Sequence, residues 1–249
     1  MNFHSLLRVD KSKKEAQKYL QVEEQIKKII TIILNNRNLK LAKLILNSDS
    51  KKPVLHIYLG SDYGFCANFN ARLNEKIRAE KDIHKIIIGK KLKKNVDHVL
   101  LSLNNESLMD KYEELESIIR EGILHKKYSK VEIIYNRYLN ASNIELQENC
   151  LFPLTTQDSV EYIDDFVYEG DIQEILIHLI SLYIMYQLVL CNISSHASEN
   201  ILRQESTSKS LKKIDELDEI YDMKERKIKK QKEFKKVLEI YTRLLTYNK

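Results

Sequence analysis

Two glycines, Gly60 and Gly64, follow the apolar run of residues 54–59, and a helix-like stretch begins a few residues later. A strand, a glycine turn and a helix start together form the geometry that binds phosphate anions. The spacing, however, fits neither G-x-G-x-x-G nor G-x-x-x-x-G-K-[ST]. The segment Ser61–Asn70, SDYGFCANFN, also contains no Lys or Arg to meet a phosphate. We therefore expect Gly64 to supply a tight turn and Asp62 to accept hydrogen bonds from loop amides.

A cysteine in the same turn, Cys66, suggests nucleophilic catalysis, because a helix N-terminus nearby would favour the thiolate. The base would have to be His56, His84 or His98, which are distant in the sequence. Most such cysteines are small buried residues of a core, and that is the interpretation we favour. With three widely spaced cysteines we expect free thiols in a reducing compartment. The seven histidines show no ligand spacing, so we predict no metal and no cofactor.

A third candidate is the basic stretch Lys224–Lys236, which has eight Lys and Arg residues against Glu225 and Glu233. It could contact nucleic acid or anionic lipid, form a solvated face of a coiled coil, or meet an acidic protein collar. The net charge of +5 is mild for 249 residues and does not require nucleic acid. We expect no nucleic-acid partner.

The elements that would position these residues alternate between strand and helix in the middle of the chain. Such alternation predicts a Rossmann-like α/β domain with a mostly parallel sheet and covering helices, which we place at residues 53–167. Predicted strands are Val54–Leu59, Lys85–Ile88, His98–Leu103 and Val131–Tyr138, with an edge strand at Glu145–Leu151, and predicted helices are Asn68–Glu80 and Asp110–Lys126.

Two helical arms flank this domain, at residues 1–48 and 171–249. In the first arm Tyr19, Val22, Ile26, Ile29 and Ile33 recur every three or four residues, as in a heptad seam. No Pro or Gly follows Gly170, so a continuous second helix would extend for about 115 Å. The arms are expected to form an antiparallel coiled coil, because each can then bury an apolar stripe. The expected fold class is therefore α/β, with two long helices added to the central domain.

One segment of the second arm, Ile175–Ile193, is apolar enough to resemble a membrane span. Polar residues interrupt it repeatedly and no basic cluster flanks it, so we favour a helix buried in a protein core. A membrane-associated coiled coil stays an alternative that liposome flotation would test.

The motifs together resemble the gamma subunit of F-type rotary ATPases. That family has a turn S-D-R-G-L-C-G-G-x-N after its first strand, and Ser61, Asp62, Gly64, Cys66 and Asn70 match it. Further matches are Tyr135-Asn136, Leu151-Phe152-Pro153-Leu154 and Tyr168-Glu169-Gly170-Asp171, and Ala197-Ser198-Glu199 with Arg203 falls on A-S-E-x-A-A-R. Departures include Tyr63 in the turn, and Lys230-Gln231 where the family has R-Q.

The resemblance implies a non-catalytic rotor shaft inside a hexameric ring of alpha/beta-type P-loop ATPase subunits. It implies ring contacts through Arg203, Lys230, Gln231 and Lys235, and a lower partner at Tyr168 and Glu169. An epsilon-like subunit and a membrane rotor ring, or other motor components, are further implied partners. The complex would be cytoplasmic and peripheral to the inner face of the cell membrane. Alternatives are the shaft of a specialised motor, such as a gliding-type ATPase, and a stand-alone α/β nucleotide-binding protein.

Overall fold

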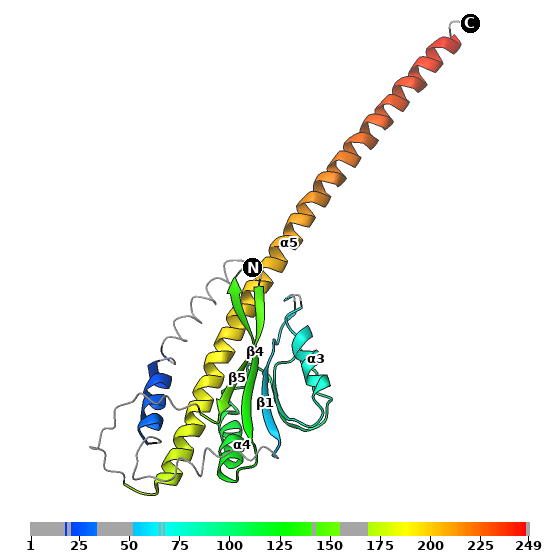
Figure 1. Cartoon of the computed structure of the whole chain (residues 1–249). Helices are drawn as coiled ribbons and strands as arrows, with labels where there is room; N and C mark the ends of the chain where they lie inside the picture. Colours follow the sequence, from blue (N-terminus) through cyan, green and yellow to red (C-terminus); the bar gives the residue numbers. More distant parts are fainter. Residues whose placement is uncertain are drawn as a thin grey trace. The chain divides into compact units, whose positions relative to one another are not determined.

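The computed structural model describes residues 18, 21–33, 52–64, 66, 68–140, 143–154 and 169–247. The chain divides into two compact units, Met1–Gln204 and Glu205–Lys249. The first unit contains an α/β domain (Figure 1). Its elements are β1 (Val54–Leu59), α3 (Ala71–Ala79), β2 (His84–Ile88), β3 (Val99–Leu103), α4 (Tyr112–Leu124), β4 (Lys130–Asn140), β5 (Asn143–Phe152) and the first part of α5 (Ile172–Tyr247).

The five strands form one sheet in the order β3-β2-β1-β4-β5. The first four strands are parallel, and β5 pairs antiparallel with β4 at the edge. The prediction of a mostly parallel sheet with a late edge strand is therefore confirmed. At the other edge, the register between β2 and β3 shifts where Leu100 has no partner. Such a bulge discourages edge-to-edge pairing with another chain.

Helices cover both faces of this sheet. Leu73 and Ile77 of α3 pack against one face, in an apolar cluster with Tyr58, Ile87 and Ile134 of the strands. A larger core on the opposite face joins α4 and α5 to the sheet (Figure 1). Alternate residues of each strand point to opposite faces, so the near-continuous apolar runs of β1 and β2 serve both cores.

The apolar segment Ile175–Ile193 lies in that larger core. Leu176, Ile180, Ile184 and Leu188 recur every four residues and are fully buried. Within the described residues, α5 is long and apolar enough to cross a membrane by length and composition, but 56% of its most apolar window is buried in the protein. The burial supports the interpretation of this segment as a core helix.

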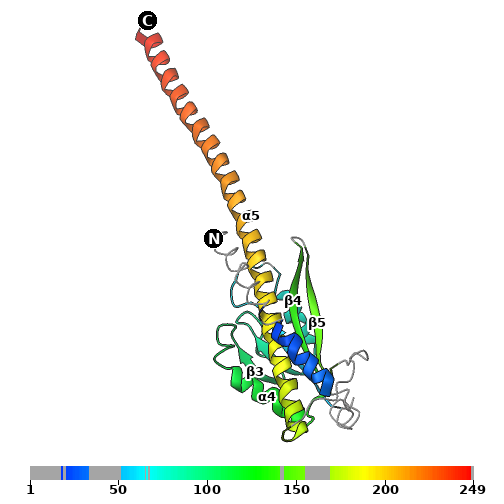
Figure 2. The same cartoon turned by 90° about the vertical axis from the view of Figure 1, so that its left-hand side faces the viewer.

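Part of the first arm is described, and residues 21–33 are helical. Ile26, Ile30 and Ile33 of this helix belong to the core that contains α5 (Figure 2), and Gln187 Nε2 donates a hydrogen bond of 2.7 Å to Glu23 Oε1. The expected seam was partly wrong, because Ile29 is 47% exposed while Ile30 is buried. The remaining residues of the first arm lie outside the described residues, and the division into three domains stays a prediction.

Candidate functional site

The turn after β1 is held together by its own polar side chains. Ser61 N donates to Asn70 Oδ1 over 3.1 Å, and Asn70 Nδ2 donates to Ser61 Oγ over 2.7 Å. Ser61 Oγ also lies 3.5 Å from Cys66 Sγ. Three of the five matching turn residues thus form one internal hydrogen-bond group, which closes the loop between β1 and α3.

A fourth turn residue, Asp62, connects the carboxyl ends of the parallel strands. Its Oδ1 accepts from the Lys90 amide over 2.7 Å, and its Oδ2 accepts from the Asn105 amide over 3.0 Å. These two residues follow β2 and β3, at the carboxyl ends of the strands, where α/β sheets bind ligands. The expectation that Asp62 accepts from loop amides is confirmed. Because the Asp62 carboxylate already accepts hydrogen bonds from these two backbone amides, this end of the sheet does not favour a phosphate.

The fifth matching residue, Gly64, lies at a bend where an added Cβ would meet no atom within 4 Å. The closest backbone packing instead involves Gly60 and Gly89. A Cβ on Gly89 would lie 2.9 Å from the Gly60 carbonyl carbon, and Gly89 has φ +133°, which favours glycine. Sequence reasoning missed Gly89, although its place directly after an apolar strand was a usable signal.

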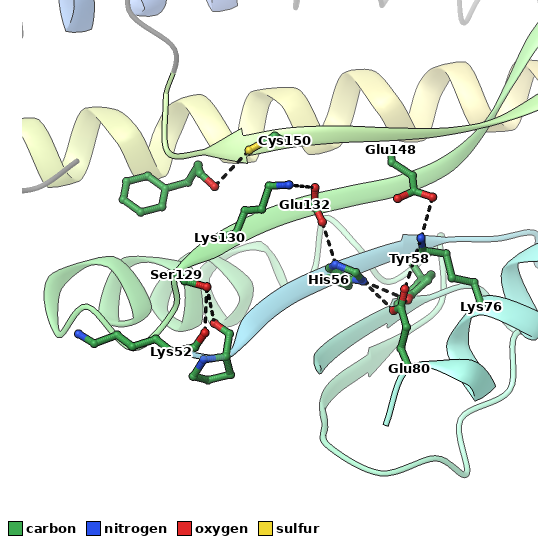
Figure 3. Close-up of polar contacts among 12 residues, drawn as sticks. Lys52, His56, Tyr58, Lys76, Glu80, Ser129, Lys130, Glu132, Glu148 and Cys150 are labelled. Atoms are coloured by element: carbon green, nitrogen blue, oxygen red, sulfur yellow. Dashed lines mark hydrogen bonds and ion pairs between the residues drawn. The ribbon is translucent and has the colours of Figure 1, made fainter. Parts of the chain in front are cut away.

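The environment of Cys66 does not activate a nucleophile. Burial raises the pKa of this thiol and is the largest influence on it, so the thiol form predominates. Of the histidines considered as bases, His84 begins β2 and His98 directly precedes β3, at the amino ends of these strands. Their rings stack with centroids 5.6 Å apart. His56 lies within β1, where it bridges the carboxylates of Glu80 and Glu132 by hydrogen bonds of 2.8 and 2.9 Å (Figure 3). The interpretation of Cys66 as a buried structural residue is supported.

The turn faces α5 at the second sequence motif. The Arg203 guanidinium lies 5.1 Å from the centroid of the Tyr63 ring, within the range of a cation–π contact. The Tyr63 hydroxyl donates to Glu106, which also accepts from Lys90 Nζ over 3.0 Å. One turn of helix earlier, Glu199 is buried, and both Glu199 and Arg203 influence the Cys66 thiol. The two motifs, distant in sequence, therefore form one junction.

The remaining predicted site residues fall elsewhere. Lys230, Gln231 and Lys235 lie on α5 in the second unit, where every side chain from 209 to 243 is exposed. Glu169 is exposed just before α5, and Tyr168 lies outside the described residues. The contacts of these residues with partners stay a prediction. Within the described residues no group of three or more His, Cys, Asp or Glu side chains could hold a metal ion.

Comparisons with known proteins agree on one family. The family model described as ATP synthase matches residues 1–242. An ATP synthase gamma chain of Xylella fastidiosa is 24% identical over 183 residues, 66% of this chain and 64% of that protein. The gamma chain of Amoebophilus asiaticus is 25% identical over 200 residues, 73% and 69% of the two chains. The chain thus spans slightly less than two thirds of the Xylella relative.

Solved structures show the same fold. A chain in the mitochondrial ATP synthase of Euglena gracilis (OSCP/F1/c-ring, rotational state 3) matches with a TM-score of 0.57 and 14% identity, over 96% of this chain and 94% of that one. The rotor of the same enzyme in rotational state 1 gives a TM-score of 0.50 over 90% and 98%. The chain therefore belongs to the ATP synthase family, and it is similar to the gamma chains of that family.

Proposed function

We propose that this chain is the central rotor shaft, or gamma-like subunit, of an F-type ATPase. In this role it performs no chemistry of its own. It couples ATP turnover in a surrounding hexameric ring of alpha/beta-type P-loop subunits to rotation of the shaft. The ring sites and the shaft angle are then linked by contacts that differ between states, and such coupling is reciprocal.

The observation that carries the proposal is the distribution of apolar side chains on α5 in the second unit. Exposed large apolar residues of the first set are Leu211, Ile214, Leu217, Ile220, Tyr221, Met223 and Ile228, and those of the second set are Phe234, Val237, Leu238, Ile240 and Tyr241. At 3.6 residues per turn, the second set points on average about 150° away from the first. The apolar face thus changes sides along the helix.

The first arm, paired with α5 as an antiparallel coiled coil, would cover only one of these two sets. In a regular two-stranded coiled coil the apolar stripe drifts around the helix by only about 20° per heptad. That amounts to roughly 50° between the middle of the first set and the middle of the second. A partner that surrounds the helix contacts both sets. Exposed apolar surface of this extent is typical of an interaction site, and the ring of an F-type ATPase is a surrounding partner.

Charge supports the same partner. The exposed stretch Lys224–Lys236 lies where the first apolar set gives way to the second, and it contains Ile228 and Phe234. Lys230, Gln231 and Lys235 within it are the proposed ring contacts, facing acidic loops of the ring. Arg203 already lies against Tyr63, so a ring contact of Arg203 would have to form beside that interaction. Glu169, with Tyr168, is the proposed contact to the lower partner.

The finer assignments are part of the proposal. We place an epsilon-like subunit and a membrane rotor ring next to the α/β domain. The complex lies on the cytoplasmic side, peripheral to the inner face of the membrane.

Affinity purification of the tagged chain from its native host in mild detergent tests the proposal. We expect one copy of the chain with three copies of each of two P-loop ATPase subunits. Recovery of the chain alone, or as a homodimer, would refute it.

A second test uses the assembled complex. Lys230→Glu combined with Gln231→Ala should slow its ATPase turnover, by no more than about fivefold, because exposed ion pairs contribute about 0–1 kcal/mol. Lys91→Glu, an exposed residue of the α/β domain, is the matched control and should leave turnover unchanged. Unchanged turnover in the double variant would remove both residues from the set of ring contacts.

A further inference from the structure

Tyr63, in the turn after β1, is an exposed side chain that is nevertheless held at both of its ends. The residue is 41% exposed, so the core of the α/β domain does not depend on its packing. Its carbonyl oxygen accepts hydrogen bonds from Ser61 Oγ over 3.1 Å and from Cys66 Sγ over 3.5 Å. Its hydroxyl, at the far end of the side chain, donates to Glu106. The ring is therefore fixed in place although water reaches it.

The groups that hold Tyr63 are themselves fixed to the carboxyl ends of the parallel strands. Glu106, which follows β3, accepts a hydrogen bond of 3.0 Å from Lys90 Nζ, and Lys90 follows β2. The backbone amides of Lys90 and Asn105 both donate to the carboxylate of Asp62, which follows β1. The loops after these three strands thus form one hydrogen-bonded platform that carries the Tyr63 ring.

Arg203 of α5 lies over the face of this ring. Its guanidinium carbon Cζ is 5.1 Å from the ring centroid, and a cation over an aromatic face is attracted by the quadrupole of the ring. The first unit ends one residue later, at Gln204, and every side chain of α5 from 209 to 243 is exposed. The contact therefore links α5 to the three strand ends at the place where the helix leaves the first unit.

A contact at this place has a large effect on the rest of the helix. α5 extends from Ile172 to Tyr247 as one helix, and Leu188 within it is fully buried in the core. Measured along the helix, Arg203 lies about 22 Å beyond Leu188, and Tyr247 lies about 90 Å beyond it. When the helix tilts about Leu188, a displacement at Arg203 is therefore multiplied about fourfold at Tyr247. A weak contact at Arg203 is enough to restrict the exposed part of α5.

We propose that Tyr63 is a positioning residue for α5 and that its contact with Arg203 braces the helix against the α/β domain. The ring presents its face to the cation, and the hydrogen bond to Glu106 keeps the ring from turning away. This brace is argued from contacts within the first unit alone. Its part in coupling rests on the rotor function proposed above, because a shaft fastened where it leaves the domain transmits its rotation to that domain with less slack.

Distance measurements by pulsed electron paramagnetic resonance on the full chain test the brace without any partner. One spin label is attached to the native Cys150, which is exposed while the other two cysteines are buried. A second label is attached through Leu211→Cys, at a position that is 51% exposed. Tyr63→Leu should raise the share of chains outside the main distance peak about two- to fivefold, as expected for the loss of an exposed cation–π contact. An unchanged distance distribution would overturn the proposal.

Matched variants separate the Arg203 contact from other effects of the substitution. Tyr63→Phe keeps the ring and should keep the narrow distribution, whereas equal broadening in Tyr63→Phe and Tyr63→Leu would contradict the role of Arg203. Arg203→Gln removes the cation and should broaden the distribution as Tyr63→Leu does, and it decides the question if Tyr63→Leu does not fold. The double variant should broaden it no further, and additive broadening would contradict a direct contact. Tyr221→Leu removes a cation–π contact with Lys224 that lies within α5, and it should leave the distribution unchanged.

Single-molecule rotation of the assembled complex tests the part of the brace in coupling. With the ring attached to a surface and a bead attached to Cys150, the bead follows the α/β domain as the shaft turns. Tyr63→Leu should widen the angular spread of the bead at each pause without changing the rate of ATP turnover, and Tyr63→Phe should not widen it. An equal spread in both variants and the wild type would refute the part in coupling. If the wild-type chain forms no complex with a ring, the proposed rotor function fails, whereas the distance measurements on the isolated chain still decide the brace.

Discussion

Replacing Glu80 by glutamine should make the free energy of unfolding of the α/β domain depend less on pH in the acid range. The pKa of Glu80 is lowered from 4.5 to about 2 in the folded chain, so the folded state binds fewer protons in acid than the unfolded state. Stabilisation by this carboxylate is therefore complete above pH 4.5 and is lost as the pH falls toward 2. Since its side chain is only 16% exposed, screening by solvent is limited.

The size of the effect follows from the two pKa values. Their difference corresponds to about 3 kcal/mol of stabilisation at pH 7, of which about 2 kcal/mol is lost on lowering the pH to 3. Glu132, whose pKa is also lowered, adds to the acid sensitivity of the wild type and remains in the variant. Glu80→Gln should therefore lose about 2 kcal/mol less than the wild type between these pH values.

Urea unfolding of the full chain at pH 7 and pH 3, followed by near-ultraviolet circular dichroism of the tyrosines, measures this difference. Glu75→Gln is the matched control, because Glu75 lies on the same helix and is exposed, and it should keep the wild-type pH dependence. If the free energy of unfolding falls equally in Glu80→Gln and in the wild type between pH 7 and pH 3, the pKa of Glu80 is not lowered in the folded chain and the reasoning is refuted.

Three further outcomes follow from packing and burial. Gly89→Ala should lower the free energy of unfolding by about 1–3 kcal/mol, because φ is +133° and the new Cβ meets backbone at 2.9 Å; Gly64→Ala, with open space, should change it by less than about 0.5 kcal/mol. Leu188 is fully buried, so Leu188→Ala should lower the free energy of unfolding by about 2–5 kcal/mol. Leu211 is 51% exposed, so Leu211→Ala should change the thermal unfolding of the isolated chain little. A thiol reagent should modify the exposed Cys150 first and reach the two buried cysteines only on unfolding; rapid modification of all three would contradict the burial.

Local patterns in the sequence were sufficient to predict strands and helices such as β1 and α5, and one contact, that of Asp62. The run Val54–Leu59 became β1 with the predicted bounds, because an apolar run between turn residues has few ways to be satisfied other than as a buried strand. Asp62 was expected to accept from loop amides and does so, since a short carboxylate after a strand reaches the amides around it. The long uninterrupted α5 followed from the absence of Pro and Gly after Gly170.

Contacts between distant segments were decided only by the tertiary structure. The junction of Tyr63 with Arg203 and the bridge from His56 to Glu80 and Glu132 join residues that are 24 to 140 positions apart. The order of the strands and the alternation of side chains along each strand determine that His56 and Glu132 share one face of the sheet. A one-residue change of register would separate them. The glycine that the fold requires, Gly89, was likewise set by how closely another strand end approaches it. A sequence determines local preference, whereas the partner of each side chain depends on how the whole chain packs.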